Sequence, residues 1–184
     1  MDVQSSRHLL YLMACGLNQW QPREMALEGL DFETLYKQAG QHSVTALVCS
    51  ALEHTRLFAQ AEPEHREKFQ NRKNQAVRRT MLFDAERRAV SETMETRGIW
   101  HVALKGSVLQ DMYSKYGIRE MADVDMLIAP DMREEARDIF LERGYRVESY
   151  GEDIHDVYCK PPIYNFEIHD ALFQRCYPVF CGIL

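Results

Sequence analysis

The chain has 184 residues, which is long enough for one domain with a hydrophobic core or for a small catalytic unit with a helical annex. Its formal net charge of −6 argues against a general nucleic-acid binder, because such proteins usually carry net positive charge or a marked basic face. Five cysteines without C-x-x-C spacing argue against a disulfide framework or a zinc site, and with no leader or membrane-length apolar run they predict a cytoplasmic protein without membrane contact.

Helical patterns dominate residues 1–98. Apolar residues recur at helical spacing over 8–16, 31–40 and 43–54, and a long helix is predicted from residue 64 to near Gly98, after a joint at 56–63. The positions of this long helix that are predicted to face inward include Phe69, Ala76, Val77, Thr80, Met81 and Ala89. Its basic residues outnumber its acidic ones, which is typical of a solvated face with ion pairs or of a basic wall that attracts a triphosphate or RNA.

Strands and helices alternate after residue 98. The expected strands are 99–105, 124–129, 145–150, 156–160 and 164–169, and the expected helices are 107–116 and 131–143. This order predicts an α+β fold in which a helical N-terminal region, residues 1–98, packs on a small mixed β-sheet formed within residues 99–184.

The first chemical feature is the run Lys105-Gly106-Ser107 between an apolar strand and a helical pattern. Glycine lets the backbone approach a ligand closely, and the free N–H groups at the start of a helix attract phosphate. Ser107 can donate its hydroxyl to the same ligand. The same three residues also fit a plain N-cap turn, with Lys105 at the end of a buried strand.

The second feature is a pair of aspartates in a short strand. Asp123 and Asp125 share one face of the strand, whereas Val124, Met126 and Ile128 form the opposite, apolar face. Burial of the apolar face directs both carboxylates to the other side, where their mutual repulsion favours a bound cation. A hard divalent metal ion suits such oxygen ligands, although solvated residues of an edge strand show the same pattern.

The third feature is the strand Asn165-Phe166-Glu167-Ile168-His169. Its alternation separates Glu167 and His169 from the apolar residues, so a third carboxylate is expected on the face that bears the aspartates. His169 is interpreted as a residue that orients Glu167, as a contact to a substrate phosphate, or as a structural histidine.

These motifs together resemble the uncharacterised nucleotidyltransferase family of the DNA polymerase β superfamily. The resemblance runs from about residue 99 to 172 and rests on the features above, together with Tyr113, Arg119 and Gly144-Tyr145. It implies Mg²⁺-dependent transfer of a nucleoside monophosphate from a nucleoside triphosphate to an acceptor. It also implies that the chain lacks further C-terminal helices of the family.

The resemblance assigns a role to each candidate residue. Asp123 and Asp125 would hold two Mg²⁺ ions, with Mn²⁺ as an alternative, and Glu167 would complete the metal site or accept the acceptor proton. Gly106 and Ser107 would hold the triphosphate. Lys105 and Arg119 are candidate phosphate contacts, and for Arg119 an ion pair with Glu120 or Asp123 is the alternative. The acceptor is expected to be a small molecule, an RNA or a protein.

Two other functions stay open from the sequence. The residues His155, Asp156, Glu167 and His169 suit a transition-metal site in a hydrolase. A non-catalytic nucleotide-binding or regulatory protein on the same fold would bind the triphosphate without turnover. Residues 177–184 are strongly apolar and predict packing against the core or a homodimer contact.

Overall fold

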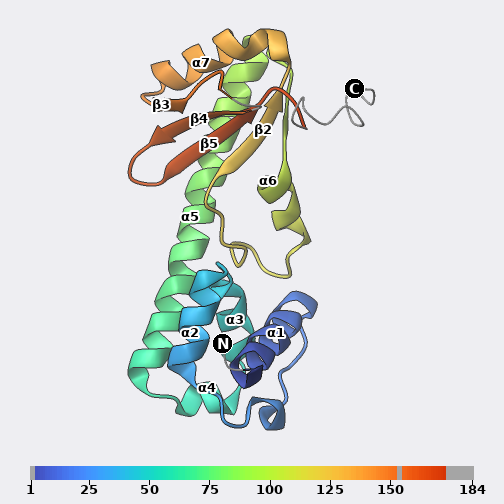
Figure 1. Cartoon of the computed structure of the whole chain (residues 1–184), viewed down its shortest axis with the longest axis vertical. Helices are drawn as coiled ribbons and strands as arrows, with labels where there is room; N and C mark the ends of the chain where they lie inside the picture. The colour runs from blue at the N-terminus through green and yellow to red at the C-terminus, as the bar shows by residue number, and fades with distance from the viewer. Residues whose placement is uncertain (1–2, 153–154, 173–184) are drawn as a thin grey trace. The chain divides into compact units, whose positions relative to one another are not determined.

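The protein is described by a computed structural model, which defines residues 3–152 and 155–172. Within these residues the fold is α+β, as predicted (Figure 1). It has seven α-helices and one five-stranded mixed sheet. The helices are α1 Val3–Asn18, α2 Phe32–Gln41, α3 Thr45–Leu52, α4 Arg56–Gln60, α5 Pro63–Thr96, α6 Lys105–Leu109 and α7 Arg133–Glu142. The strands are β1 His101–Ala103, β2 Val124–Ile128, β3 Arg146–Ser149, β4 His155–Lys160 and β5 Tyr164–His169.

The described residues form two compact units. Residues 3–81 and 110–121 make a helical unit, and residues 82–109, 122–152 and 155–172 make a sheet unit. The division falls within α5, between residues 81 and 82, and the predicted domain boundary at residue 98 stays a prediction. The segment 110–121 also returns to the helical unit after the first strand.

The core of the helical unit is built from the apolar faces of α1 to α4 and the first part of α5. Leu12, Leu35, Leu52 and Phe69 are almost completely buried in it. Asp31 is the N-cap of α2, since its carboxylate accepts hydrogen bonds from backbone N–H groups at the start of this helix. This unit is therefore a packed helical body of the kind that the apolar periodicity predicted.

Segment 110–121 is tied to the helices by close backbone approach. Gly117 has φ +76°, and a Cβ atom at this position would lie 2.7 Å from the Cα of Val77, so glycine is required here. The Ser114 hydroxyl donates to the Gly16 carbonyl oxygen at 2.9 Å, and Glu120 accepts from the Ala46 N–H at 2.9 Å. Segment 110–121 belongs to the helical unit, and α6 ends at Leu109, so the single helix predicted for 107–116 does not form.

The sheet unit has the strand order β1-β2-β5-β4-β3. β2 and β5 are parallel neighbours, and the other three pairings are antiparallel. Figure 1 shows β5 between β2 and β4. Because β5 has partners on both sides, its side chains meet those of two other strands in a fixed register.

One face of this sheet is the hydrophobic core of the unit. Phe140 of α7 stacks on Tyr158 with ring centroids 4.4 Å apart and also contacts Phe166. Phe83, from the part of α5 in this unit, contacts Tyr164. Because alternate residues of a strand point to opposite faces, burial of this aromatic cluster leaves the intervening side chains on the other face.

Several local predictions need correction. Residues 107–116 form the short helix α6, which begins at Lys105, and a 3₁₀ turn over Gln110–Met112. The expected joint at 56–63 is largely helical, as α4, because Thr55 caps it with its side chain. Met81 is exposed on α5, whereas Phe83, Val90 and Met94 supply buried positions.

None of the described helices combines the length and apolar character needed to cross a bilayer. Cys15, Cys49 and Cys159 are free thiols within the described chain. The apolar segment 177–184, for which a dimer contact was predicted, lies outside the described residues.

Candidate active site

The second face of the sheet carries the predicted carboxylates. Asp125 of β2 lies directly opposite Glu167 of β5 in the parallel register, and Leu127 lies opposite His169. Residues 124, 126 and 128 are buried on the core face, so Asp125 belongs to the other face, as the alternation predicted. We call this side, with Asp125, Glu167 and His169, the site face.

Three side chains on the site face converge on one point. Asp125, Glu167 and His169 each offer a metal-ligand atom, and these atoms all lie within 4.8 Å of one another. The His169 Nε2 donates to Asp125 Oδ1 at 3.1 Å and lies 3.9 Å from Glu167 Oε2. Asp125 and His169 are only 4% and 5% exposed, so solvent reaches the group mainly on the side of Glu167.

Lys105 completes this group from the start of α6. Its Nζ donates to Asp125 Oδ1 at 2.7 Å, the same oxygen that accepts from His169. The backbone of Lys105 has φ +40°, an unfavourable conformation for a side chain with a Cβ atom. The neighbouring Leu104 N–H donates to the Asp125 carbonyl oxygen at 3.0 Å, which holds this turn against β2.

The charges in the group stabilise one another. Burial raises the pKa of Asp125, but hydrogen bonds from His169 and Lys105 outweigh this effect, and the pKa lies below its usual value. The hydrogen bond to Asp125 raises the pKa of Lys105 above its usual value. The site therefore holds an ionised carboxylate and a protonated amine at neutral pH, and the Lys105 side chain is 59% exposed.

The remaining candidates of the sheet unit lie close to this group in sequence. Asp123 immediately precedes β2 and is not among the three residues whose ligand atoms converge, although its charge contributes to the raised pKa of Lys105. Gly106 is buried inside α6 and not in a turn before it. The Ser107 hydroxyl oxygen is buried and has no hydrogen-bond partner among the described residues.

Arg119 belongs to the helical unit. There it lines a small hollow with His42, Tyr113 and Glu120. The predicted ion pair of Glu120 forms instead with Arg72, whose Nη2 lies 2.7 Å from Glu120 Oε2. The role of Arg119 as a phosphate contact stays a prediction.

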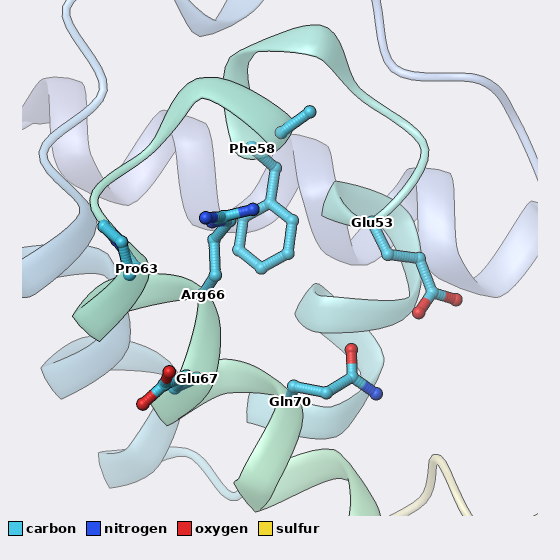
Figure 2. Close-up of a pocket in the computed structure, with 7 residues that line it drawn as sticks. Glu53, Phe58, Pro63, Arg66, Glu67 and Gln70 are labelled. Carbon is cyan, nitrogen blue, oxygen red and sulfur yellow. The ribbon is translucent and has the colours of Figure 1, made fainter.

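A wider hollow in the helical unit lies between α4 and the first turns of α5 (Figure 2). Phe58, Arg66 and Gln70 are among its lining side chains, and none of the predicted site residues is. Glu53 also lines it, but its carboxylate already pairs with Lys73 and Lys115. This hollow does not gather a set of groups suited to acid–base or metal chemistry.

The alternative metal set of the sequence is only partly assembled. His155 lies opposite His169, and the two rings are 5.1 Å apart. Asp156, in contrast, is fully buried and accepts two hydrogen bonds from Arg133, at 2.7 and 2.5 Å. The prediction of Asp156 as a metal ligand is therefore wrong, because alternation places it on the core face, where α7 supplies its cation.

Two relationships in the site were not predicted from the sequence. The hydrogen bond from Lys105 to Asp125 depends on the turn before α6, and the bond from His169 to Asp125 depends on the pairing of β5 with β2. Spacing along the chain carries no signal for either contact. Only the alternation of polar residues at Glu167 and His169 pointed to a shared face.

This mixed sheet, with carboxylates on one open face and a lysine beside them, fits the nucleotidyltransferase type of fold. A family model described as an uncharacterised nucleotidyltransferase matches residues 28–181, so the chain belongs to this family. The match extends into the helical unit, beyond the resemblance seen from residue 99. No curated protein and no solved structure matches the chain.

Proposed function

We propose that the protein is a metal-dependent nucleotidyltransferase that transfers a nucleoside monophosphate from a nucleoside triphosphate to an acceptor and releases pyrophosphate. The observation that carries this proposal is the convergence of Asp125, Glu167 and His169, with Lys105 beside them, on the site face. Membership of the nucleotidyltransferase family supports the class of reaction.

The donor set fits a divalent metal ion. Two carboxylates supply hard oxygen ligands, which suit Mg²⁺ and also Mn²⁺. The His169 Nε2 is used in the hydrogen bond to Asp125. Asp123 lies two residues before Asp125 and is proposed as a further oxygen ligand. When bound, such ions neutralise phosphate charge and lower the pKa of an attacking hydroxyl.

The residues around the carboxylates suit the triphosphate. Lys105 carries a positive charge on a long, mostly exposed side chain, so its amine can contact a phosphate oxygen without leaving the site. Gly106 and Ser107 follow directly, and the Ser107 hydroxyl is a free donor among the described residues. Phosphoryl transfer relies on positioning and charge neutralisation, and the site offers groups for both.

Glu167 is proposed as the acceptor's proton partner. It is the least buried of the three converging residues, and its Oε2 lies 3.9 Å from the His169 ring nitrogen. His169 donates to Asp125 and thereby fixes the orientation of that carboxylate. In this proposal Asp125 and Glu167 bind the metal, and His169 orients Asp125. Lys105 contacts phosphate, and Glu167 also accepts the proton of the acceptor.

The test is the release of pyrophosphate from each nucleoside triphosphate, with Mg²⁺ and with Mn²⁺. Label transfer from the same triphosphates to a cell extract identifies whether the acceptor is RNA, protein or a small molecule. Asp123→Ala and Asp125→Ala are the matched variants. Equal release by these variants and the wild type would remove the proposal. Tight triphosphate binding without release in any condition would identify a non-catalytic nucleotide-binding protein instead.

A further inference from the structure

Strand β1 extends the site face to an edge of the sheet. Val102 lies opposite Leu127, which in turn lies opposite His169. The pairing continues one step before β1, since the Ala129 N–H donates to the Trp100 carbonyl oxygen at 3.3 Å. One cross-strand row of the site face therefore runs from Val102 through Leu127 to His169.

Alternation places Trp100 on this same face. Ile99 is 2% exposed and belongs to the core face. Trp100 and Val102 lie one and three residues after Ile99, so alternation directs both to the site face. Their exposure agrees, since Trp100 is 59% exposed and Val102 is 43% exposed. The site face thus carries a charged centre at Asp125 and an apolar, aromatic margin at β1.

The exposed indole ring of Trp100 leaves apolar surface in contact with water, which is unfavourable, and a bound ligand that covers the ring would offset this free energy. This ring is large enough to supply much of the energy of a binding contact, and it stands beside a second exposed apolar side chain instead of among polar ones. A flat aromatic surface beside a phosphate-binding centre suits a ligand that is anionic at one end and aromatic at the other.

The spacing suits such a ligand. Trp100 pairs with Ala129, which lies four residues beyond Asp125 along the chain, so Trp100 and Asp125 are about 13 Å apart in the strand direction. The indole ring spans part of this length. An extended nucleoside triphosphate, with its phosphates near Asp125 and Lys105, spans the rest and brings its base to the edge of the sheet.

We propose that Trp100, supported by Val102, stacks on the base of the bound nucleoside triphosphate; this inference rests on the function proposed above. Stacking needs only a π-face and reads no hydrogen-bond pattern, so it accepts every base. Purines offer the larger ring and are preferred over pyrimidines. Trp100 therefore sets the preference for purine over pyrimidine bases. The carboxylates act only on the phosphate end of the ligand, through the metal ion that they are proposed to bind.

Tryptophan fluorescence tests the stacking directly, because the chain has only two tryptophans, Trp20 and Trp100. In the Trp20→Phe variant the signal reports on Trp100 alone. With Mn²⁺ present, a non-hydrolysable ATP analogue is expected to quench this signal, and the cytidine analogue less so. Inorganic tripolyphosphate, which has no base, is expected to bind without quenching.

Affinities of the variants separate stacking from phosphate binding. Trp100→Ala is expected to weaken binding of the ATP analogue by about tenfold, as expected for a lost base–aromatic stack, and to leave the affinity for tripolyphosphate unchanged. Trp100→Phe retains a ring and should recover most of the affinity. Unchanged tripolyphosphate binding also shows that each variant is folded.

Two outcomes would overturn the inference. If Trp100→Ala binds the ATP analogue as tightly as the wild type, or if tripolyphosphate quenches Trp100 as strongly as the nucleotide does, the base does not stack there, while the proposed function stands. If the wild type binds neither probe, the proposed function fails together with this inference.

Discussion

Two aspartates of the sheet unit, Asp156 and Asp125, are both buried, but the cations that pair with them differ in their exposure to solvent. Asp156 is completely buried and accepts two hydrogen bonds from Arg133 and one from the Gly151 N–H at 2.8 Å. Arg133 is itself only 20% exposed and also pairs with Asp170. This cluster is closed, since its charges satisfy one another away from water.

The cluster of Asp125 is open. Its cation, Lys105, is 59% exposed, and Glu167 beside it is partly exposed. The charges of this cluster are therefore available to a ligand, whereas those of the Asp156 cluster are used within the fold. Both carboxylates are buried, so the exposure of the partner cation is what distinguishes the proposed binding cluster from the closed one.

Removal of the closed cluster's cation is expected to have the largest effect. Arg133→Met would leave Asp156 without its cation in the core, which costs about 3–5 kcal/mol of unfolding free energy. Urea unfolding of the purified variant measures this loss. Adding Asp156→Asn to the variant should recover part of the stability, and a loss no greater than that of a surface substitution would contradict the closed-cluster interpretation.

Neutralisation of the open cluster's carboxylate should affect activity more than stability. Asp125→Asn is expected to reduce pyrophosphate release by more than about 100-fold, because even a residue that only supports a metal ligand is typically worth 10–100-fold. Its thermal midpoint should stay close to that of the wild type. A variant that loses activity only in proportion to its folded fraction would place Asp125 among structural residues.

Lys105 offers a smaller and more selective test. Lys105→Gln is expected to weaken triphosphate binding by about tenfold, since a hydrogen bond to a charged group is lost. Stability should fall by only about 1 kcal/mol, because the amine is mostly exposed and His169 still donates to Asp125. Lys105→Arg retains the charge and serves as the matched control. Equal affinities of all three proteins, measured by calorimetry, would exclude a phosphate contact at this position.

A third cluster, in the helical unit, is expected to show the smallest effect. Burial raises the pKa of Glu53, but hydrogen bonds from Lys73 and Lys115 outweigh it and hold the pKa below 4.5. The folded-state pKa is lowered, so this stabilisation is present above pH 4.5 and is lost as the pH falls through the lower folded value. Glu53→Gln should cost about 1 kcal/mol at neutral pH. Denaturation at several pH values should show the difference from the wild type shrinking below pH 4.5, and a constant difference would contradict this assignment.

The sequence predicted the parts of the fold and site that depend on periodicity. The alternation in 124–128 and 164–169 correctly predicted two strands with an apolar face and a polar face. That alternation also placed Asp125 and Glu167 on the polar faces of their own strands, and the pairing of β2 with β5 brings the two together. The long helix α5 was also predicted nearly to its ends.

Contacts that depend on strand order were not predictable. Asp156 and Glu167 both alternate with apolar neighbours, and only the place of α7 and of β5 decides that one meets Arg133 and the other meets Asp125. The same holds for the close approach of Gly117 to Val77, which follows the early end of the helix predicted for 107–116. Local patterns carry no information about such partners.

The register of β5 also bears on how this chain can change in length. Because β5 is paired on both sides, insertion or deletion of one residue within it would turn Glu167 and His169 toward the aromatic core and Phe166 toward water. Both the proposed catalytic group and the packing of the core would be lost together. Length variation among natural homologues should therefore be confined to the loops outside residues 164–169, whereas substitutions that preserve the alternation are tolerated within the strand.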